Sequence, residues 1–73
     1  MENFEIQVLL KDGSFADYDV QFSDNEYMVL ERGKRLITFN ADNSSSWNVV
    51  SNEGALDPDL QERIINQLKG LII

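Results

Sequence analysis

The residues of this chain that are equipped for chemistry are carboxylates, because histidine and cysteine are both absent. Without histidine there is no general base of the usual kind at neutral pH, and no Ser–His or Cys–His pair can activate a nucleophile. Asp17 and Asp19 lie on one face of a predicted strand, but acid–base catalysis by paired carboxylates needs an apolar pocket and a substrate cleft. A chain of 73 residues is too short to build a deep pocket. We therefore expect no enzymatic activity and no cofactor.

The same carboxylates are the candidates for a metal site. Glu5, Asp17 and Asp19 supply hard oxygen ligands, but they lack the spacing of a calcium-binding EF-hand loop. The four glycines are isolated, so the chain has no glycine-rich phosphate loop either. We interpret the three acids as a solvated patch, and we expect no bound metal.

The net charge of −7 is concentrated in the first half of the chain. Residues 1–31 hold eight acids against Lys11 alone, whereas residues 32–73 hold five acids and five bases. Such a field repels nucleic-acid backbones and anionic membranes, so we expect no direct nucleic-acid binding and no membrane association. A basic protein is the natural complement, although the charge is also explained by solubility alone.

Length and composition predict one domain over residues 1–73. The apolar fraction of 42%, which includes four Phe, two Tyr and one Trp, is ordinary for a folded domain. Met1 to Glu5 is acidic where a signal peptide is basic, and no apolar run approaches the roughly 18 residues of a membrane span. We therefore expect a cytoplasmic protein.

Two runs of alternating apolar and polar residues predict a first hairpin, with strands at about 4–10 and 14–22. A two-residue loop between them places the two apolar stripes on opposite faces. A three-residue loop, Lys11-Asp12-Gly13, pairs Ile6 with Tyr18 and gives Gly13 the left-handed conformation of a G1 bulge. We therefore predict the register with the three-residue loop.

This register gives the first hairpin an acidic outer face. Glu5 lies opposite Asp19, and Gln7 lies opposite Asp17. Like charges that face each other across strands are mildly unfavourable, so these carboxylates should remain in solvent. We term Glu5, Asp17 and Asp19 the acidic patch.

A second pair of strands is predicted at about 27–31 and 35–40, around an Arg32-Gly33-Lys34 turn. The expected pairs are Tyr27 with Phe39, Val29 with Ile37, and Leu30 with Leu36. Glu31 then faces Arg35 as a surface ion pair, which is worth at most about 1 kcal/mol.

Both faces of this second hairpin are apolar. Either the hairpin is covered on both sides, or Met28, Leu30 and Leu36 form an exposed patch that binds a partner. Trp47 is a further candidate because tryptophan is enriched at binding hot spots, although it more often caps a core. We term Met28, Leu30, Leu36 and Trp47 the apolar candidates.

The last third of the chain predicts a helix. Residues 47–50 form either a fifth strand or an extended connection. Asp57 is an N-cap, Pro58 suits the first helical position, and Gly70 suits a C-terminal cap, so the helix should span about 58–69. Its apolar stripe consists of Leu60, Ile64, Ile65, Leu68, Leu71 and Ile72. The predicted fold class is α+β: an antiparallel meander of four strands, or five, packed against one C-terminal α-helix.

A succession of short motifs also carries a resemblance. The motifs are Tyr18-Asp19-Val20, Tyr27-Met28-Val29, Gly33-Lys34, Ile37-Thr38-Phe39 and Leu56-Asp57. Over most of its length the chain resembles a group of short, uncharacterised bacterial proteins, and it departs from them mainly over residues 43–52. The resemblance implies a bacterial protein with a strand meander and a terminal helix, and it brings no activity or site residues.

The sequence leaves two functions open. The first is a small non-catalytic interaction or accessory domain, which binds another protein or itself through an exposed sheet face or edge. A homodimer is its simplest form. The second is an acidic phage-type inhibitor, in which the acidic patch together with Asp24 and Glu26 mimics nucleic-acid charge towards a basic protein groove.

Overall fold

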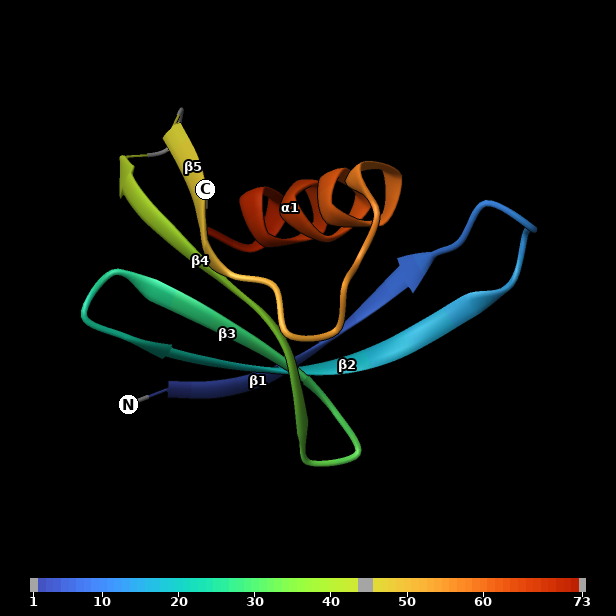
Figure 1. Ribbon diagram of the computed structural model, residues 1–73, viewed down its shortest axis with the longest axis horizontal. Helices are drawn as coiled ribbons and strands as arrows, with labels where there is room; N and C mark the ends of the chain where they lie inside the picture. Colours follow the sequence, from blue (N-terminus) through green and yellow to red (C-terminus); the bar gives the residue numbers. More distant parts are fainter. Residues whose placement is uncertain (1, 44–45, 73) are drawn as a thin grey trace.

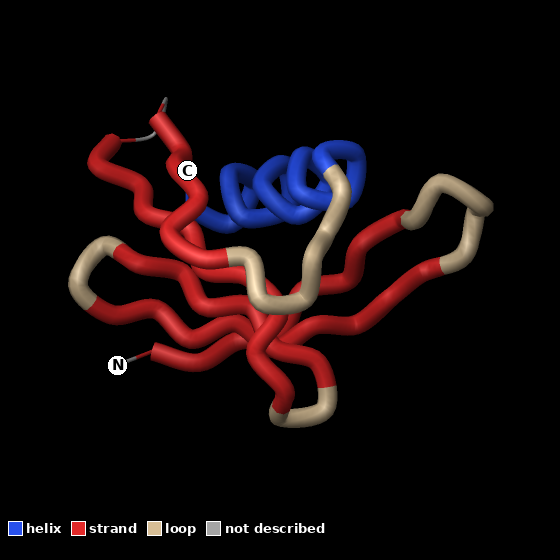
Figure 2. The backbone as a smooth tube through the Cα atoms, viewed as in Figure 1, coloured by secondary structure: helices blue, strands red, loops and turns tan. Residues whose placement is uncertain are grey.

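The computed structural model describes residues 2–43 and 46–72, which form a five-stranded sheet and one helix (Figure 1). The elements are β1 (Glu2–Leu9), β2 (Phe15–Ser23), β3 (Glu26–Glu31), β4 (Lys34–Asn43), β5 (Ser46–Ser51) and α1 (Pro58–Ile72). Every strand pairs antiparallel with the next one in the chain, in the order β1-β2-β3-β4-β5. The predicted α+β meander is confirmed, and the segment left open in the sequence is a fifth strand. Figure 2 shows the hairpin turns pointing in different directions, as the twist of a sheet requires.

The first hairpin has the predicted register. Its apolar pairs are Phe4 with Val20, Ile6 with Tyr18, and Val8 with Ala16. The N–H of Leu10 donates to the carbonyl of Ser14 at 2.7 Å, and Gly13, at φ 90°, donates its N–H to the carbonyl of Leu10 at 3.0 Å. The Asp12 carboxylate accepts hydrogen bonds from the hydroxyl and the N–H of Ser14, which lower its pKa. The three-residue loop with a left-handed glycine is therefore confirmed.

The second hairpin departs from the predicted register beside its turn. Tyr27 pairs with Phe39 and Val29 with Ile37, as expected. Beyond them, Leu30 pairs with Arg35 and Glu31 pairs with Lys34, so the loop is Arg32-Gly33 alone. Both loop residues have positive φ, 53° and 78°, which is the conformation of a type I′ turn. The predicted three-residue loop and the pairing of Leu30 with Leu36 are wrong, because this turn matches the twist of the strands.

The shift in register leaves Leu36 as an extra residue in β4, in a β-bulge. Its carbonyl accepts a hydrogen bond of 2.7 Å from the N–H of Gly54, in the connection between β5 and α1. Arg35 lies 3.5 Å from the carboxylate of Glu53 in the same connection. The predicted ion pair between Arg35 and Glu31 is therefore wrong, and the bulge is tied to a segment far away in the sequence.

β4 and α1 both continue past their predicted ends. β4 continues past Asn40 to Asn43. α1 continues through Gly70 to Ile72, so the predicted helix end at Lys69 is wrong. Apart from its chain neighbours and the adjacent backbone of α1, no described atom lies within 4 Å of the position that a Cβ on Gly70 would take. This glycine is therefore neither a cap nor a packing requirement.

The start of α1 is fixed as its sequence predicts. The Asp57 carboxylate accepts a hydrogen bond of 2.8 Å from the N–H of Leu60, and Pro58 is the first helical residue. In the connection before the helix, the Asn52 side chain accepts from the N–H of Leu56 at 2.8 Å and donates to its carbonyl at 3.0 Å. These bonds hold the chain that carries α1 back across the sheet.

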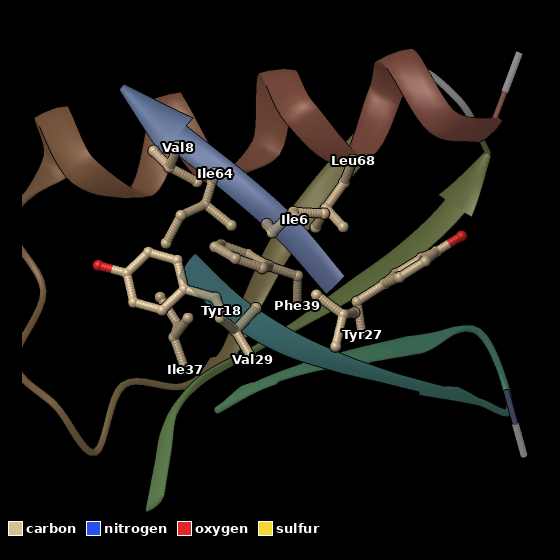
Figure 3. Close-up of a cluster of buried hydrophobic side chains, with 10 residues drawn as sticks. Ile6, Val8, Tyr18, Tyr27, Val29, Ile37, Phe39, Ile64 and Leu68 are labelled. Atoms are coloured by element: carbon tan, nitrogen blue, oxygen red, sulfur yellow. The ribbon is translucent and has the colours of Figure 1, made fainter. Parts of the chain in front are cut away.

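The core lies between α1 and one face of the sheet (Figure 3). Its buried residues are Ile6, Val8, Tyr18, Val20, Tyr27, Val29, Ile37, Phe39, Ile64 and Leu68. Ile64 and Leu68 are the fully buried residues of α1. Arg63 joins the helix to the sheet, because its guanidinium donates to the carbonyl of Leu9 at 3.0 Å. The same guanidinium donates to Asp59, one turn earlier in α1, at 2.8 Å. Within the described residues, no helix has the length and apolar character required to cross a membrane.

Candidate functional site: the open face of the sheet

The candidate site is the face of the sheet that α1 does not cover, here termed the open face (Figure 1). Side chains alternate between the two faces of a strand, and opposed residues share a face. The open-face residues of β1, β2 and β3 are therefore the neighbours of the core residues in sequence. They are Asn3, Glu5, Gln7, Leu9, Phe15, Asp17, Asp19, Gln21, Met28 and Leu30.

The open face brings the acidic patch together. Glu5 lies opposite Asp19, Gln7 lies opposite Asp17, and all three carboxylates belong to exposed residues. None of the three takes part in an ion pair with another described residue. Their charges are therefore free to act on a partner.

Apolar side chains lie next to these acids. Leu30 pairs with Asp19, and Met28 pairs with Gln21 on one side and with Thr38 on the other. Met28 and Leu30 are half-buried and do not belong to the core, whereas Thr38 is 5% exposed. The open face thus has an apolar strip on β3 beside the acidic strands β1 and β2.

A hollow of about 440 Å³ lies where the acids and the apolar strip meet. Its lining residues are Asn3, Phe4, Glu5, Asp19, Val20, Gln21, Leu30 and Gly33. Gly33 belongs to the turn between β3 and β4, and Glu5 to β1, so three neighbouring strands and a turn contribute to the concave surface. The arrangement offers carboxylates and the apolar side chain of Leu30 to the same ligand.

A second apolar feature of the open face was not predicted. Leu9 and Phe15 are opposed in the first hairpin and are 46% and 61% exposed. The signal was present in the sequence, since Phe15 has the same phase in β2 as Asp17 and Asp19, where a polar residue is expected. The open face of this hairpin therefore ends in an exposed apolar pair.

The other two apolar candidates lie elsewhere. Leu36 packs against the core beneath the β5–α1 connection, where a Cβ on Gly54 would lie 3.0 Å from its Cδ2 atom. Trp47 packs against Tyr27 and Phe39, with ring centroids 5.1 Å and 6.3 Å apart. Its indole N–H is buried without a hydrogen-bond partner among the described residues. The four candidates thus divide into an open-face pair, Met28 and Leu30, and a core-side pair.

No group of three or more acidic residues in the described part of the chain is arranged to hold a metal ion. The acidic patch thus differs from a metal centre in geometry, although its residue types are suitable. Its chemistry is that of a charged surface for recognition.

Comparison of the chain with protein-family models, curated proteins and solved structures finds no match. The resemblance to short bacterial proteins stays an expectation from the sequence motifs. The proposed function therefore rests on the residues of the open face.

Proposed function

We propose that this protein is a small non-catalytic interaction domain whose open face binds a basic partner protein. The observation that carries the proposal is the presence of the acidic patch and of half-buried Met28 and Leu30 on one uncovered face. Sheets with one open face usually present polar side chains there. Large apolar residues among unpaired carboxylates are characteristic of a surface that is covered when it functions.

The two kinds of side chain have different tasks in this proposal. The carboxylates attract a basic surface and orient it, which raises the association rate and disfavours acidic competitors. Leu30 and Met28 supply the apolar area that leaves water when the partner is in place. The complementary partner segment therefore carries lysine or arginine beside an apolar side chain.

A native pull-down from lysate tests this assignment. The wild-type protein should retain a basic protein at low salt, and retention should fall as the salt concentration rises. Asp17→Asn with Asp19→Asn, and separately Leu30→Ser, should each reduce retention. Glu62→Gln is the matched control, because Glu62 is an exposed acid on α1. Equal retention by all four proteins would contradict the proposal.

Self-association is a second form of binding, which the edge strand β5 favours. β5 ends the sheet, carries no charged residue, and exposes Val49 and Val50 by 46% and 53%. Natural edge strands are usually protected by charge or proline. The opposite edge, β1, has Glu2 and Glu5 and is bridged by the bond from Arg63 to Leu9. We propose a homodimer in which β5 pairs with β5 of a second copy.

Sedimentation velocity over a concentration series tests the homodimer. The wild-type protein should shift from monomer to dimer, and Val50→Lys should remain monomeric because a charge on an edge strand disfavours pairing with another strand. Asn66→Lys adds the same charge on an exposed position of α1 and should leave the dimer intact. A wild-type protein that stays monomeric at the highest concentration would exclude the homodimer.

The nucleic-acid mimic is the alternative function. The opposition of Glu5 and Asp19, with Asp17 on the same face, supports it because it gathers negative charge on two adjacent strands. A mimic binds through charge alone, so its complex should dissociate at high salt and after Asp17→Asn with Asp19→Asn. A complex that survives either treatment would exclude the mimic. A cytoplasmic location in a bacterium stays a prediction from the sequence, and cell fractionation tests it.

A further inference from the structure

A second hollow lies on the covered side of the sheet, at the end where β1 begins. It has a volume of about 420 Å³ and is lined by Glu2, Phe4, Glu5, Phe22, Tyr27 and Leu71. Phe4 and Glu5 also line the open-face hollow, so β1 separates the two concave surfaces. We term this second surface the aromatic hollow.

The strand register builds the wall of the aromatic hollow. Glu2 lies opposite Phe22, and Phe22 lies opposite Tyr27, so the three side chains form one row across β1, β2 and β3. The rings of Phe22 and Tyr27 are 4.5 Å apart between centroids and inclined at 34°. Figure 3 shows Tyr27 at the end of the core nearest the last turns of α1, with its hydroxyl pointing away from the other buried side chains.

Three independent features make this hollow attractive to a cation. Aromatic faces carry the negative part of the ring quadrupole. Glu2 adds a carboxylate on this side of the sheet, and no lysine or arginine is among the lining residues. Leu71 belongs to the last turn of α1, where the negative end of the helix dipole adds to the attraction and the charge of Lys69 in the same turn offsets part of it. A neutral apolar ligand would use the rings but would gain nothing from the other two features.

The field of Glu2 reaches the aromatic wall. Burial, and secondly the charge of Glu2, raise the pKa of the Tyr27 phenol. A tyrosine is neutral at physiological pH, so the ring presents its face without a phenolate charge. In the row formed by Glu2, Phe22 and Tyr27, Glu2 is thus the one carboxylate beside two aromatic rings.

We propose that the aromatic hollow binds the alkylammonium end of a lysine side chain from a partner protein. The aliphatic stem of the lysine packs on Phe4 and Leu71, and the ammonium group reaches the ring of Phe22 and the carboxylate of Glu2. The site shares Glu5 with the acidic patch as a lining residue, but the contacts proposed for it use no carboxylate of that patch and nothing from β5. It therefore stands or falls separately from the proposed function.

Titration followed by NMR tests this site, with N-acetyl-lysine methylamide as the probe and N-acetyl-norleucine methylamide as its uncharged counterpart. The lysine probe should shift the ring resonances of Phe22 and Tyr27 and the methyl resonances of Leu71. The norleucine probe should leave them in place. Equal shifts with both probes would overturn the proposal, because the hollow would then be a general apolar surface.

Two variants and one control complete the test. Phe22→Leu should weaken binding of the lysine probe by about threefold to thirtyfold, the range of a cation–π contact. Glu2→Gln should weaken it by up to about fivefold, the range of an exposed ion pair. Glu2 is exposed, so its substitution leaves the fold intact even if Phe22→Leu disturbs it. Asp17→Asn on the open face should bind the probe like the wild-type protein. Undiminished binding by Glu2→Gln would overturn the assignment.

Discussion

The two faces of the sheet are made by alternate residues of the same strands, yet they differ in almost every property. On the covered face, Val8, Val20 and Val29 are completely buried between the sheet and α1. On the open face, their neighbours in sequence include exposed acids and half-buried Leu30. The covered face therefore determines whether the chain folds. The residues of the open face are not needed for the core and are therefore available for binding.

The largest effect should separate the two faces directly. Ile64→Ala removes a fully buried side chain from the covered side, and we expect a loss of about 2–5 kcal/mol in the free energy of unfolding. Leu30→Ala removes a half-buried side chain from the open face, and the loss should be about 1 kcal/mol or less. Urea denaturation of both variants measures the difference. Equal losses would mean that the open face is part of the core.

The connection that carries α1 onto the covered face should be almost as sensitive. A Cβ on Gly54 would lie 3.0 Å from the Cδ2 atom of Leu36 and 3.2 Å from its Cα atom. Because the backbone of the bulge cannot move away easily, Gly54→Ala should cost about 1–3 kcal/mol. Gly70→Ala is the control: the helix continues there with free space, so it should stabilise by about 0.5–1 kcal/mol. Thermal denaturation distinguishes the two, and a neutral Gly54→Ala would show that the bulge is not held by this contact.

Alkaline pH should lower the free energy of unfolding through two tyrosines of the covered face, Tyr18 and Tyr27. Burial is the first cause that raises the pKa of Tyr18 and Tyr27, and the charges of Glu31 and Glu2 are the second. A phenol with a raised pKa in the folded state loses its proton more readily after unfolding. Its contribution to stability is present below the unfolded value of about 10 and is lost as the pH rises through the folded value.

Wild-type protein should therefore lose unfolding free energy above pH of about 10. A double variant, Tyr18→Phe with Tyr27→Phe, should lose less, since lysine titration in the same range is common to both proteins. Denaturation at a series of alkaline pH values measures the two slopes. Parallel slopes would show that the phenols are not desolvated by the core.

The sequence predicted the register of the first hairpin to the residue and that of the second only in part. In the first, two clean alternations and Gly13 leave one register that places both apolar stripes on one face. In the second, both faces are apolar, so the pattern does not choose between registers one residue apart. Two features fix the observed register. Arg32 has a positive φ, which cannot be predicted from an arginine. The hydrogen bond from the N–H of Gly54 to the carbonyl of Leu36 joins distant parts of the chain.

Of the candidate surfaces, likewise, one could be predicted from the sequence and one could not. The acidic patch was predictable because it depends on one hairpin register. The aromatic hollow was not, since its wall needs the pairing of β2 with β3 and its rim needs α1 to continue past Gly70. Trp47 was left open between core and surface, and its contact with Tyr27 depends on β5, which the sequence did not assign.

The smallest effect on stability should come from the most exposed aromatic residue of the open face. Phe15→Thr keeps a strand-forming residue but removes a ring that is 61% exposed, so the free energy of unfolding should change by less than about 0.5 kcal/mol. If the open face binds the partner, the same variant should lower retention in the pull-down while its denaturation curve stays in place. Tyr18 belongs to the same strand but is buried on the covered face. Tyr18→Thr should therefore shift the denaturation curve. A loss of stability at Phe15 as large as at Tyr18 would show that the hairpin tip is structural, and the distinction between the two faces would not extend to it.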